Sequence, residues 1–197
     1  MEEYYERRAP AYDDWYLGRG LYADRDRPGW AEELARLTET ITSLPPARTL
    51  DVACGTGFLT RHLHGEVVGL DQSPAMLEEA ARQAPAASFV QGDALALPFP
   101  DATFDRVFTG HFYGHLETGR RGRFLAEARR VAPELVVVDS SRGCSEIDEE
   151  MSVRVLDDGS RWEVFKRWFT AAGLAAELGG AEVLHDGRFF VAVRAPR

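Results

Sequence analysis

The sequence predicts an α/β fold in which a mostly parallel sheet lies between layers of helices. An apolar run over residues 49–54 stops abruptly at Gly55, and helical periodicity begins at Phe58, as in a buried strand followed by a turn and a helix. Two more apolar segments, 67–70 and 88–92, follow at the spacing of strands that alternate with helices. Such alternation is typical of parallel sheets, in which the carboxyl ends of adjacent strands face one crevice.

The helices expected around the first three strands have recognisable start and stop signals. Pro28 opens a helix whose apolar residues recur in steps of three and four up to Leu44, where two prolines end it. After the glycine turn, a short helix is expected to run to about His64. A Ser-Pro pair at 73–74 then supplies an N-cap and a first helical position for a helix that ends near Gln83.

The second half of the chain continues this alternation and then departs from it. The expected elements are a fourth strand over 104–109, a loop over 110–116, a helix over 119–131, a fifth strand over 135–138, an added hairpin over 150–169, a helix capped by Thr170 and stopped by Gly179-Gly180, and a last hairpin that pairs 183–184 with 189–193. The unbroken apolar run of the fifth strand indicates burial on both faces.

The glycine turn after the first strand is a candidate ligand site. Gly55 and Gly57 lack a Cβ, so the backbone there can take left-handed angles and approach a bound group, while free N–H groups at the helix start offer donors. Glycine turns also close ordinary strand–helix junctions, so the surroundings decide. Asp71 and Asp93 end the second and third strands and would face the turn across the crevice. A carboxylate at the end of the second strand suits the two hydroxyls of a ribose.

Three runs of sequence around these residues resemble the first three motifs of the class I S-adenosylmethionine (SAM) dependent methyltransferases. They are LDVACGTGFLT from Leu50, VVGLDQSPAML from Val67 and FVQGDALALPFPDATFD from Phe89. The resemblance covers about residues 4–138 and is strongest for the branch that includes the ubiquinone and menaquinone biosynthesis methyltransferases. It disfavours a nicotinamide dinucleotide site, because Thr60 stands where the third glycine of that fingerprint would be.

The resemblance implies a Rossmann-like, seven-stranded, mostly parallel sheet of order 3-2-1-4-5-7-6 with helices on both faces. It also implies SAM as the cofactor and S-adenosylhomocysteine (SAH) as the product. Asp71 would bind the ribose, Gln72 would flank the adenine, and the Asp93 carboxylate and Ala94 N–H would pair with the adenine edge, beside apolar Leu95. The other implied cofactor positions are Tyr12, in a segment similar to the family's A-x-x-Y-D, and Asp51, Ala53, Gly55, Gly57, Met76 and Thr109.

Length and composition are consistent with one domain. At 197 residues, of which 45% are hydrophobic and 28% charged, the chain can bury one proper core. We expect a single domain over 1–197, with an N-terminal helical lid over 1–27. The alternative for 1–27 is a helix that only packs on the core. The hairpin carries four aromatic residues, which either form a wall of the acceptor pocket or pack the hairpin onto the sheet: Trp162, Phe165, Trp168 and Phe169.

Charge and cysteine content exclude several classes of partner. A net charge of -9 and a pI near 5.1 argue against a nucleic-acid partner, and the cluster of arginines over 120–130 is interpreted as a solvated helix face. Cys54 and Cys144 do not form a disulfide framework, and no spacing suggests a metal site. Without a leader or an apolar span, the protein is expected to be cytoplasmic and to act on a small molecule away from membranes. The oligomeric state stays open.

Methyl transfer from a sulfonium needs alignment and exclusion of water more than it needs a metal or a covalent residue. An acceptor hydroxyl would be helped by a base, and His111, directly after the fourth strand, is the first candidate. His115 is the second, although a structural hydrogen bond is the more ordinary role for it. Tyr5, Arg8 and Tyr113 are possible acceptor contacts. An oxygen acceptor is therefore favoured.

Two other functions are compatible with the cofactor motifs. A SAM-binding regulatory or partner subunit would carry the same glycine turn, but its acceptor side would be plugged by Tyr12 or by the aromatic residues of the second half. An open cavity beside the methyl group would favour the enzyme. An RNA methyltransferase is disfavoured by the acidic charge of the chain.

Overall fold

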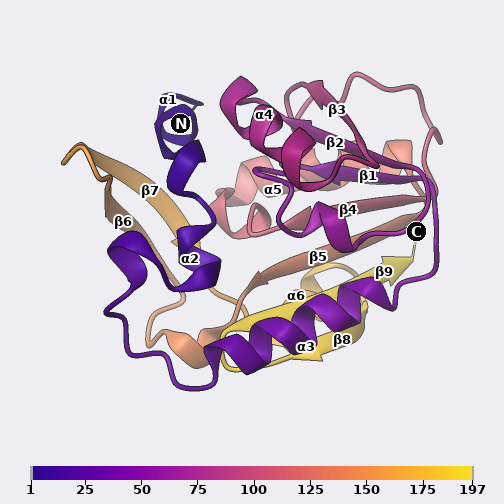
Figure 1. Cartoon of the computed structure of the whole chain (residues 1–197). Helices are drawn as coiled ribbons and strands as arrows, with labels where there is room; N and C mark the ends of the chain where they lie inside the picture. The colour runs from indigo at the N-terminus through magenta and orange to yellow at the C-terminus, as the bar shows by residue number, and fades with distance from the viewer. Residues whose placement is uncertain (1, 197) are drawn as a thin grey trace.

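The computed structural model describes residues 2–196, which form the predicted α/β fold around one twisted sheet (Figure 1). The strands are β1 Thr49–Val52, β2 Val67–Asp71, β3 Ser88–Gln91, β4 Arg106–Gly110, β5 Glu134–Ser140, β8 Glu182–Asp186 and β9 Phe190–Pro196. The sheet has seven strands in the order β3-β2-β1-β4-β5-β9-β8. β1 to β5 are parallel, and β9 is antiparallel to both of its neighbours. The predicted order is confirmed.

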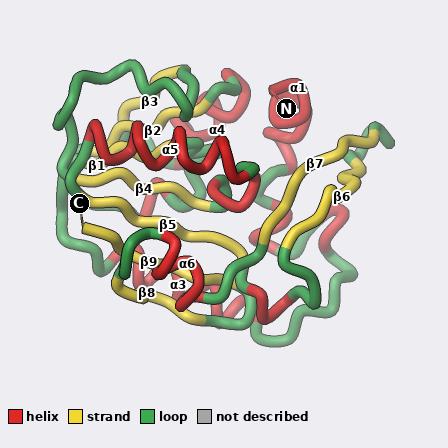
Figure 2. The backbone as a smooth tube through the Cα atoms, turned by 180° about the vertical axis from the view of Figure 1, so that it is seen from behind, coloured by secondary structure: helices red, strands yellow, loops and turns green. Residues whose placement is uncertain are grey.

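Helices cover both faces of the sheet. α3 (Trp30–Thr42) and α4 (Pro74–Gln83) lie in front of the sheet in Figure 1, whereas α5 (Thr118–Val131) and α6 (Ala171–Glu177) lie in front in the reversed view of Figure 2. Two apolar clusters fill the space between these layers. One includes Leu37 of α3, and the other includes Phe124 and Leu174 of α5 and α6. The inner strands of the sheet are therefore buried on both faces, whereas the edge strands β3 and β8 are partly exposed. The carboxyl ends of β1, β2 and β4 are left for a site.

The structure corrects one expectation, the helix predicted between the glycine turn and His64. The structure has only a single 3-10 turn, η3 (Thr60–His62), after which Leu63 is extended. The Thr60 hydroxyl donates to buried Asp51 over 2.6 Å, which holds the turn against β1. Leu63 is buried and the chain reaches β2 at Val67, so a longer helix would have to displace this apolar anchor. The helix-like spacing of apolar residues in this segment therefore comes from a single 3-10 turn followed by the buried side chain of Leu63.

Other boundaries differ only slightly from expectation. α3 starts at Trp30 after Gly29, whose φ of 84° turns the chain, and not at Pro28. α4 begins and ends where the sequence signals place it, and the Ser73 hydroxyl accepts from the Met76 N–H over 3.1 Å as its N-cap. Two further 3-10 turns lie near the site, η4 (Tyr113–His115) and η5 (Arg142–Cys144).

The N-terminal segment and the added hairpin lie together beside the carboxyl end of the sheet (Figure 1). The segment consists of α1 Glu2–Arg8, η1 Ala9–Ala11, α2 Asp14–Leu17 and η2 Gly20–Tyr22. The hairpin, β6 Glu149–Val155 and β7 Arg161–Arg167, forms a separate two-stranded sheet, as expected. Tyr4 of α1 contacts Trp162 of the hairpin, so the two additions support one another. Over residues 2–196, no helix has the length and apolarity to cross a membrane.

Candidate functional site

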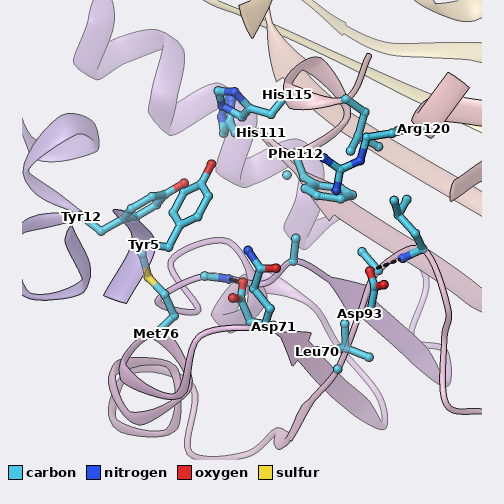
Figure 3. A pocket seen from close by; sticks show the side chains of 18 residues that line it. Tyr5, Tyr12, Leu70, Asp71, Met76, Asp93, His111, Phe112, His115 and Arg120 are labelled. Atoms are coloured by element: carbon cyan, nitrogen blue, oxygen red, sulfur yellow. Dashed lines mark hydrogen bonds between the residues drawn. The ribbon is translucent and has the colours of Figure 1, made fainter. Parts of the chain in front are cut away.

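A pocket opens at the carboxyl ends of β1, β2 and β4, beside the glycine turn (Figure 3). We call it the glycine-loop pocket. Its lining includes these predicted cofactor positions: Tyr12, Ala53, Gly55, Asp71, Gln72, Met76, Asp93, Ala94 and Leu95. Figure 3 shows Asp71 and Asp93 on one side of the pocket and Tyr5, Tyr12, His111 and His115 opposite them. The pocket therefore brings residues of the N-terminal segment together with residues at the strand ends, more than 80 positions away in the chain.

The glycine turn has the left-handed backbone that its composition predicts. φ is 57° at Ala53, 55° at Gly55 and 76° at Gly57. The Gly55 N–H donates to Asp71 Oδ2 over 3.0 Å, and the Ser73 N–H donates to Asp71 Oδ1 over 3.0 Å, so this carboxylate ties the turn to the end of β2. Burial raises the pKa of Asp71, although these backbone donors counteract part of the effect.

Gly57 contributes to packing and is absent from the pocket lining given for the described residues. A Cβ at this position would lie 3.0 Å from the Ala80 Cα and 3.3 Å from the Ala80 carbonyl oxygen. Both are atoms of α4 that cannot move without shifting the helix. Gly57 therefore lets α4 pack against the turn, which places the start of α4 next to the pocket.

Asp51 lies beneath the turn, in a smaller cavity that it shares with Tyr12 and Gly55. Its Oδ2 accepts from Thr60, whereas Oδ1 is buried and has no hydrogen-bond partner among the described residues. Burial raises the pKa of Asp51 to about 7. A buried carboxylate oxygen without a donor fits a ligand that brings a donor or a positive charge to this point.

Thr109 ties two strands together. It is fully buried, and its hydroxyl donates to the Val52 carbonyl over 2.8 Å, from β4 to β1. Two residues that sequence reasoning did not assign to the cofactor, Phe112 and Arg120, do line the glycine-loop pocket near Asp93 (Figure 3). For Arg120 the only sequence signal was its place in a run of arginines, which was interpreted as a solvated face.

His111 directly follows β4 and has a φ of 55°, an uncommon angle for a residue with a side chain. Its backbone N–H donates to the Val138 carbonyl over 2.8 Å, which fixes this conformation. The side chain is 7% exposed, and both ring nitrogens lack a hydrogen-bond partner among the described residues. The ring packs at 4.9 Å from Trp15 and 5.6 Å from Phe190, measured between centroids. Burial lowers the pKa of His111 to about 4.

His115 lies on η4 and is fixed by the hairpin. Its Nδ1 is 2.7 Å from the Phe165 carbonyl oxygen, which can only accept, so Nδ1 carries the proton and Nε2 is left as an acceptor. Burial lowers the pKa of His115 to about 3, and the charge of Lys166 acts in the same direction. Both histidines are therefore neutral at neutral pH.

A second cavity adjoins the first, and Tyr5, Tyr12, His111 and His115 line both. We call it the basic pocket. The hairpin contributes Arg154, Val164, Lys166 and Trp168 to its lining. Aromatic and basic side chains between Tyr4 of α1 and Trp30 at the start of α3 line the opposite part of the cavity. The two cavities meet where the four shared residues lie.

The hairpin forms a wall of the basic pocket with a different set of residues from the one expected. Of the four aromatic residues singled out in the sequence, Trp168 lines the cavity. Trp162 packs 6.0 Å from Tyr4, and Phe169 is buried in the core 5.8 Å from Tyr113. Side chains alternate along a strand, so Val164 and Lys166 face the cavity and Phe165 does not.

Among the possible acceptor contacts, Tyr5 and Arg8 line the basic pocket, but the expectation for Tyr113 is wrong. The Tyr113 side chain is fully buried, and its hydroxyl donates to Glu177 of α6 over 2.8 Å. Its ring belongs to the core cluster under α5 and α6, on the far side of η4 from the cavities.

Sequence reasoning missed a buried ion pair next to the histidines. Lys166 is the only lysine of the sequence, and its Nζ lies 2.7 Å from Asp139 Oδ1. Asp139 Oδ2 also accepts from the Gly114 N–H over 2.7 Å, which anchors η4. Burial raises the pKa of Asp139, but attraction to Lys166, His111 and His115 outweighs it, so this pKa lies below its ordinary value. The pair joins β5 to β7, a contact that no local pattern predicts.

Comparison with known proteins matches this chain to methyltransferases, in agreement with the resemblance of the three sequence motifs. The family described as "Methyltransferase domain" matches residues 49–134. The demethylmenaquinone methyltransferase of Thermotoga maritima is 40% identical over 132 residues, which cover 64% of this chain and 54% of that protein. The enzyme of the same name from Deinococcus radiodurans is 38% identical over 140 residues, covering 66% and 55%. The chain thus spans about half the length of the curated relatives that it matches.

Solved structures extend the likeness over nearly the whole chain. The DhpI complex with SAM and HEP superposes with a TM-score of 0.76 at 28% identity and covers 98% of this chain and 95% of that one. The DhpI complex with SAH gives a TM-score of 0.73 at 29% identity. These neighbours carry the cofactor and the product that the sequence motifs imply.

Proposed function

Because the chain belongs to the class I SAM-dependent methyltransferases, we propose that it transfers the methyl group of SAM to a small molecule, with an oxygen acceptor favoured. One observation carries the proposal. The glycine-loop pocket, to which we assign SAM, meets a second cavity at Tyr5, Tyr12, His111 and His115. A donor in one cavity and an acceptor in the other would face each other at this junction.

The residues present fit SAM at three points. The Asp71 carboxylate is positioned to accept from the ribose hydroxyls, and Asp93 with the Ala94 N–H to pair with the adenine edge. At the methionine end, Asp51 Oδ1 is a buried acceptor without a donor among the described residues, and the ammonium group of SAM would supply one. The bound cofactor supplies a methyl group on a positively charged sulfur, which leaves as a neutral thioether.

The side chains at the junction would exclude water and orient the acceptor. Burial raises the pKa of Tyr12 to about 12, and it raises that of Tyr5 as well, so both remain neutral phenols that can donate hydrogen bonds. In Figure 3 both hydroxyls point toward the histidine side of the pocket. Alignment of donor and acceptor in such a site accounts for most of the catalysis that a displacement of this kind needs.

His111 is the group best placed to receive a proton from an acceptor hydroxyl. Its ring is neutral at neutral pH, the residue lines both cavities, and its buried ring nitrogens have no competing hydrogen bond among the described residues. His115 has Nε2 as a further acceptor, but its Nδ1 is committed to the hairpin. We therefore assign proton acceptance to His111 and a positioning role to His115.

The alternative of a SAM-binding subunit without methyl transfer requires a plugged acceptor side. Tyr12 lines both cavities without closing the second, and Trp168 lies on the wall of the basic pocket. An open cavity next to the cofactor pocket supports the enzyme, since a binding subunit has no use for it.

The first test is the binding of SAM and SAH to the wild type and to Asp71→Asn, measured by calorimetry. We expect the variant to bind both ligands about tenfold or more weakly, because the amide loses the charge that strengthens two hydrogen bonds to the ribose. Asp186→Asn is the matched control, because Asp186 also ends a strand but is exposed and lines none of the cavities described above. Absence of binding to the wild type, or equal binding by both variants, would remove the cofactor assignment.

A further inference from the structure

The basic pocket has a charge opposite to that of the protein. The chain carries a formal net charge of -9, yet six cationic side chains line this one cavity: Arg8, Arg25, Arg27, Arg154, Lys166 and Arg188. Among residues 3–196, Asp26 is the only acidic side chain in its lining, and it is exposed. Arg25 and Arg188 are exposed at the rim, Arg8, Arg27 and Arg154 are half-buried, and Lys166 is buried.

These cations are poorly neutralised by the protein itself. Lys166 is paired with Asp139, but within residues 3–196 none of the five arginines forms an ion pair with a carboxylate side chain. Arg8 donates to the hydroxyls of Tyr4 and Tyr22 over 2.7 and 3.3 Å, and Arg27 donates to the Trp15 carbonyl over 3.1 Å. Partly buried guanidinium groups without an anion are costly unless a ligand brings one.

Arg154 is the clearest of these groups. It lies one residue before the end of β6, opposite Trp162, and its side chain makes no hydrogen bond to the described residues. It lines the basic pocket together with Tyr4 of the N-terminal segment and His115 at the junction. A guanidinium offers paired N–H donors that match the two oxygens of a carboxylate or a phosphate group.

We propose that the methyl acceptor is a small organic anion whose carboxylate or phosphate-type group is held in the basic pocket by Arg154 together with Arg8 and Lys166. The inference rests on the proposed function, because it names the substrate class for the acceptor side of the same site. The exposed Arg25 and Arg188 would attract the anion to the cavity before it binds.

A second, independent feature of the pocket supports a ligand at this place. His111 lines the cavity, and its two ring nitrogens are buried without a hydrogen-bond partner among the described residues, so a polar group of the acceptor that reaches the ring would satisfy one of them. The anionic end would lie toward Arg154 and the reacting end toward His111. Such an arrangement orients a small acceptor by its charge and leaves its other end at the cofactor.

The test uses phenyl phosphate and benzoate as anionic probes and benzamide and benzyl alcohol as neutral counterparts. Each is titrated into the full-length wild type with and without SAH at pH 7.5, and binding is followed by tryptophan fluorescence, since Trp15, Trp30 and Trp168 line the pocket. We expect at least one anion to bind, to bind more weakly as salt is raised, and to outcompete its neutral counterpart. The stronger of the two anions identifies the acidic group.

The variant Arg154→Gln should bind that anion about tenfold or more weakly while binding SAH as the wild type does. Arg161→Gln is the matched control, because Arg161 lies on the same hairpin, is exposed and is outside the pocket lining given for the described residues. The double variant Arg154→Gln/Arg188→Gln tests whether the exposed Arg188 binds the anion when Arg154 is removed. Three results would overturn the proposal. They are that the neutral probes bind as tightly as the anions, that neither anion binds, or that the double variant binds the anion as tightly as the wild type does. If the wild type does not bind SAH, the proposed function itself is overturned.

Discussion

His111 shows how a single residue can combine backbone strain, burial and unpaired polarity. Its left-handed φ is held by the bond from its N–H to Val138, and its ring nitrogens have no partner among the described residues. Each of these features costs folding free energy, and costs of this kind are tolerated where a ligand or a reaction compensates for them. The sequence shows a histidine at this position. It does not predict the left-handed φ of the backbone or the absence of hydrogen-bond partners for the ring nitrogens.

Substitution of His111 by asparagine separates its chemistry from its backbone. Asparagine tolerates the left-handed region better than alanine does, so His111→Asn removes the imidazole with little added strain. We expect turnover to fall roughly 100-fold with SAM affinity intact, as for loss of a general base. Because the pKa of His111 is lowered to about 4, activity limited by its protonation should decline near pH 4 and not near pH 6.5.

The matched control is His64→Asn, which changes an exposed histidine outside both cavities. Steady-state turnover with a saturating acceptor, measured from pH 4 to 8, checks both parts of the prediction. Wild-type turnover in His111→Asn would exclude it as the proton acceptor. An acidic limb near pH 6.5 would mean that the imidazole is solvated during catalysis.

The residues of the site differ in how far the sequence predicted them. Asp71 and Asp93 were predictable because one ends β2 and the other closely follows β3, and the carboxyl ends of adjacent parallel strands must meet. Lys166 and Asp139 were not, because their contact joins β5 to the hairpin, and strand pairing outside the main sheet carries no local signal. Tyr113 was placed wrongly because a loop position does not reveal which way a side chain turns.

At the scale of elements, the N-terminal segment is fastened to the glycine turn by one carboxylate. Asp13, just before α2, accepts from the hydroxyl of Thr56 in the turn and from the side-chain amide of Gln83 at the end of α4. Tyr16 of α2 stacks on Phe58 with 4.0 Å between centroids. These contacts hold Tyr12 at the glycine-loop pocket, which is what a lid over 1–27 would require.

Asp13→Ala should weaken this attachment without touching the pocket lining. We expect SAM to bind about tenfold more weakly, because two charge-assisted hydrogen bonds that hold the covering segment are lost. Calorimetry with SAM gives the affinity, and proteolysis of the segment gives its exposure. The control is Asp24→Ala, which changes an exposed carboxylate of the same segment. Unchanged affinity together with faster proteolysis would show that the segment packs on the core but does not act as a lid.

Elements with strong local signals were predicted well, and elements with weak ones were not. α4 has a serine cap and a proline at its first position, and its bounds agree with the prediction. The helix expected up to His64 is only η3, because the hydrogen bond from Thr60 to Asp51 and the buried Leu63 override helical spacing. The hairpin was found, but which of its faces lines the cavity depends on register, and a shift of one residue would reverse it.

At the scale of the whole molecule, buried ionisable groups concentrate at the functional edge of the sheet. Asp51, Asp71, His111, His115 and Asp139 are all buried or half-buried around the two cavities. The two apolar clusters on either side of the sheet supply the stability that tolerates them. Their pKa values shift in different directions, so the pH dependence of folding has opposing parts.

The histidines and Asp51 act in opposite senses over the same range of pH. The pKa values of His111 and His115 are lowered to about 4 and about 3, so the unfolded chain, with histidine pKa near 6.5, binds more protons, and their contribution to stability is lost as pH falls below about 6.5. The pKa of Asp51 is raised to about 7, so its contribution is present at low pH and is lost as pH rises from about 4 to 7.

A comparison of the wild type with His111→Asn isolates the contribution of His111 to the pH dependence of stability, because Asp51 is present in both proteins. The free energy of unfolding, measured in urea from pH 4 to 7.5, should fall more steeply toward acid in the wild type than in the variant. The difference arises because only the wild type must bury a neutral imidazole at position 111 while its unfolded chain becomes protonated there. His64→Asn should give a curve parallel to that of the wild type, since His64 is exposed. A His111→Asn curve parallel to the wild type would mean that water reaches the imidazole in the folded protein, and the dry junction between the two cavities would then have to be abandoned.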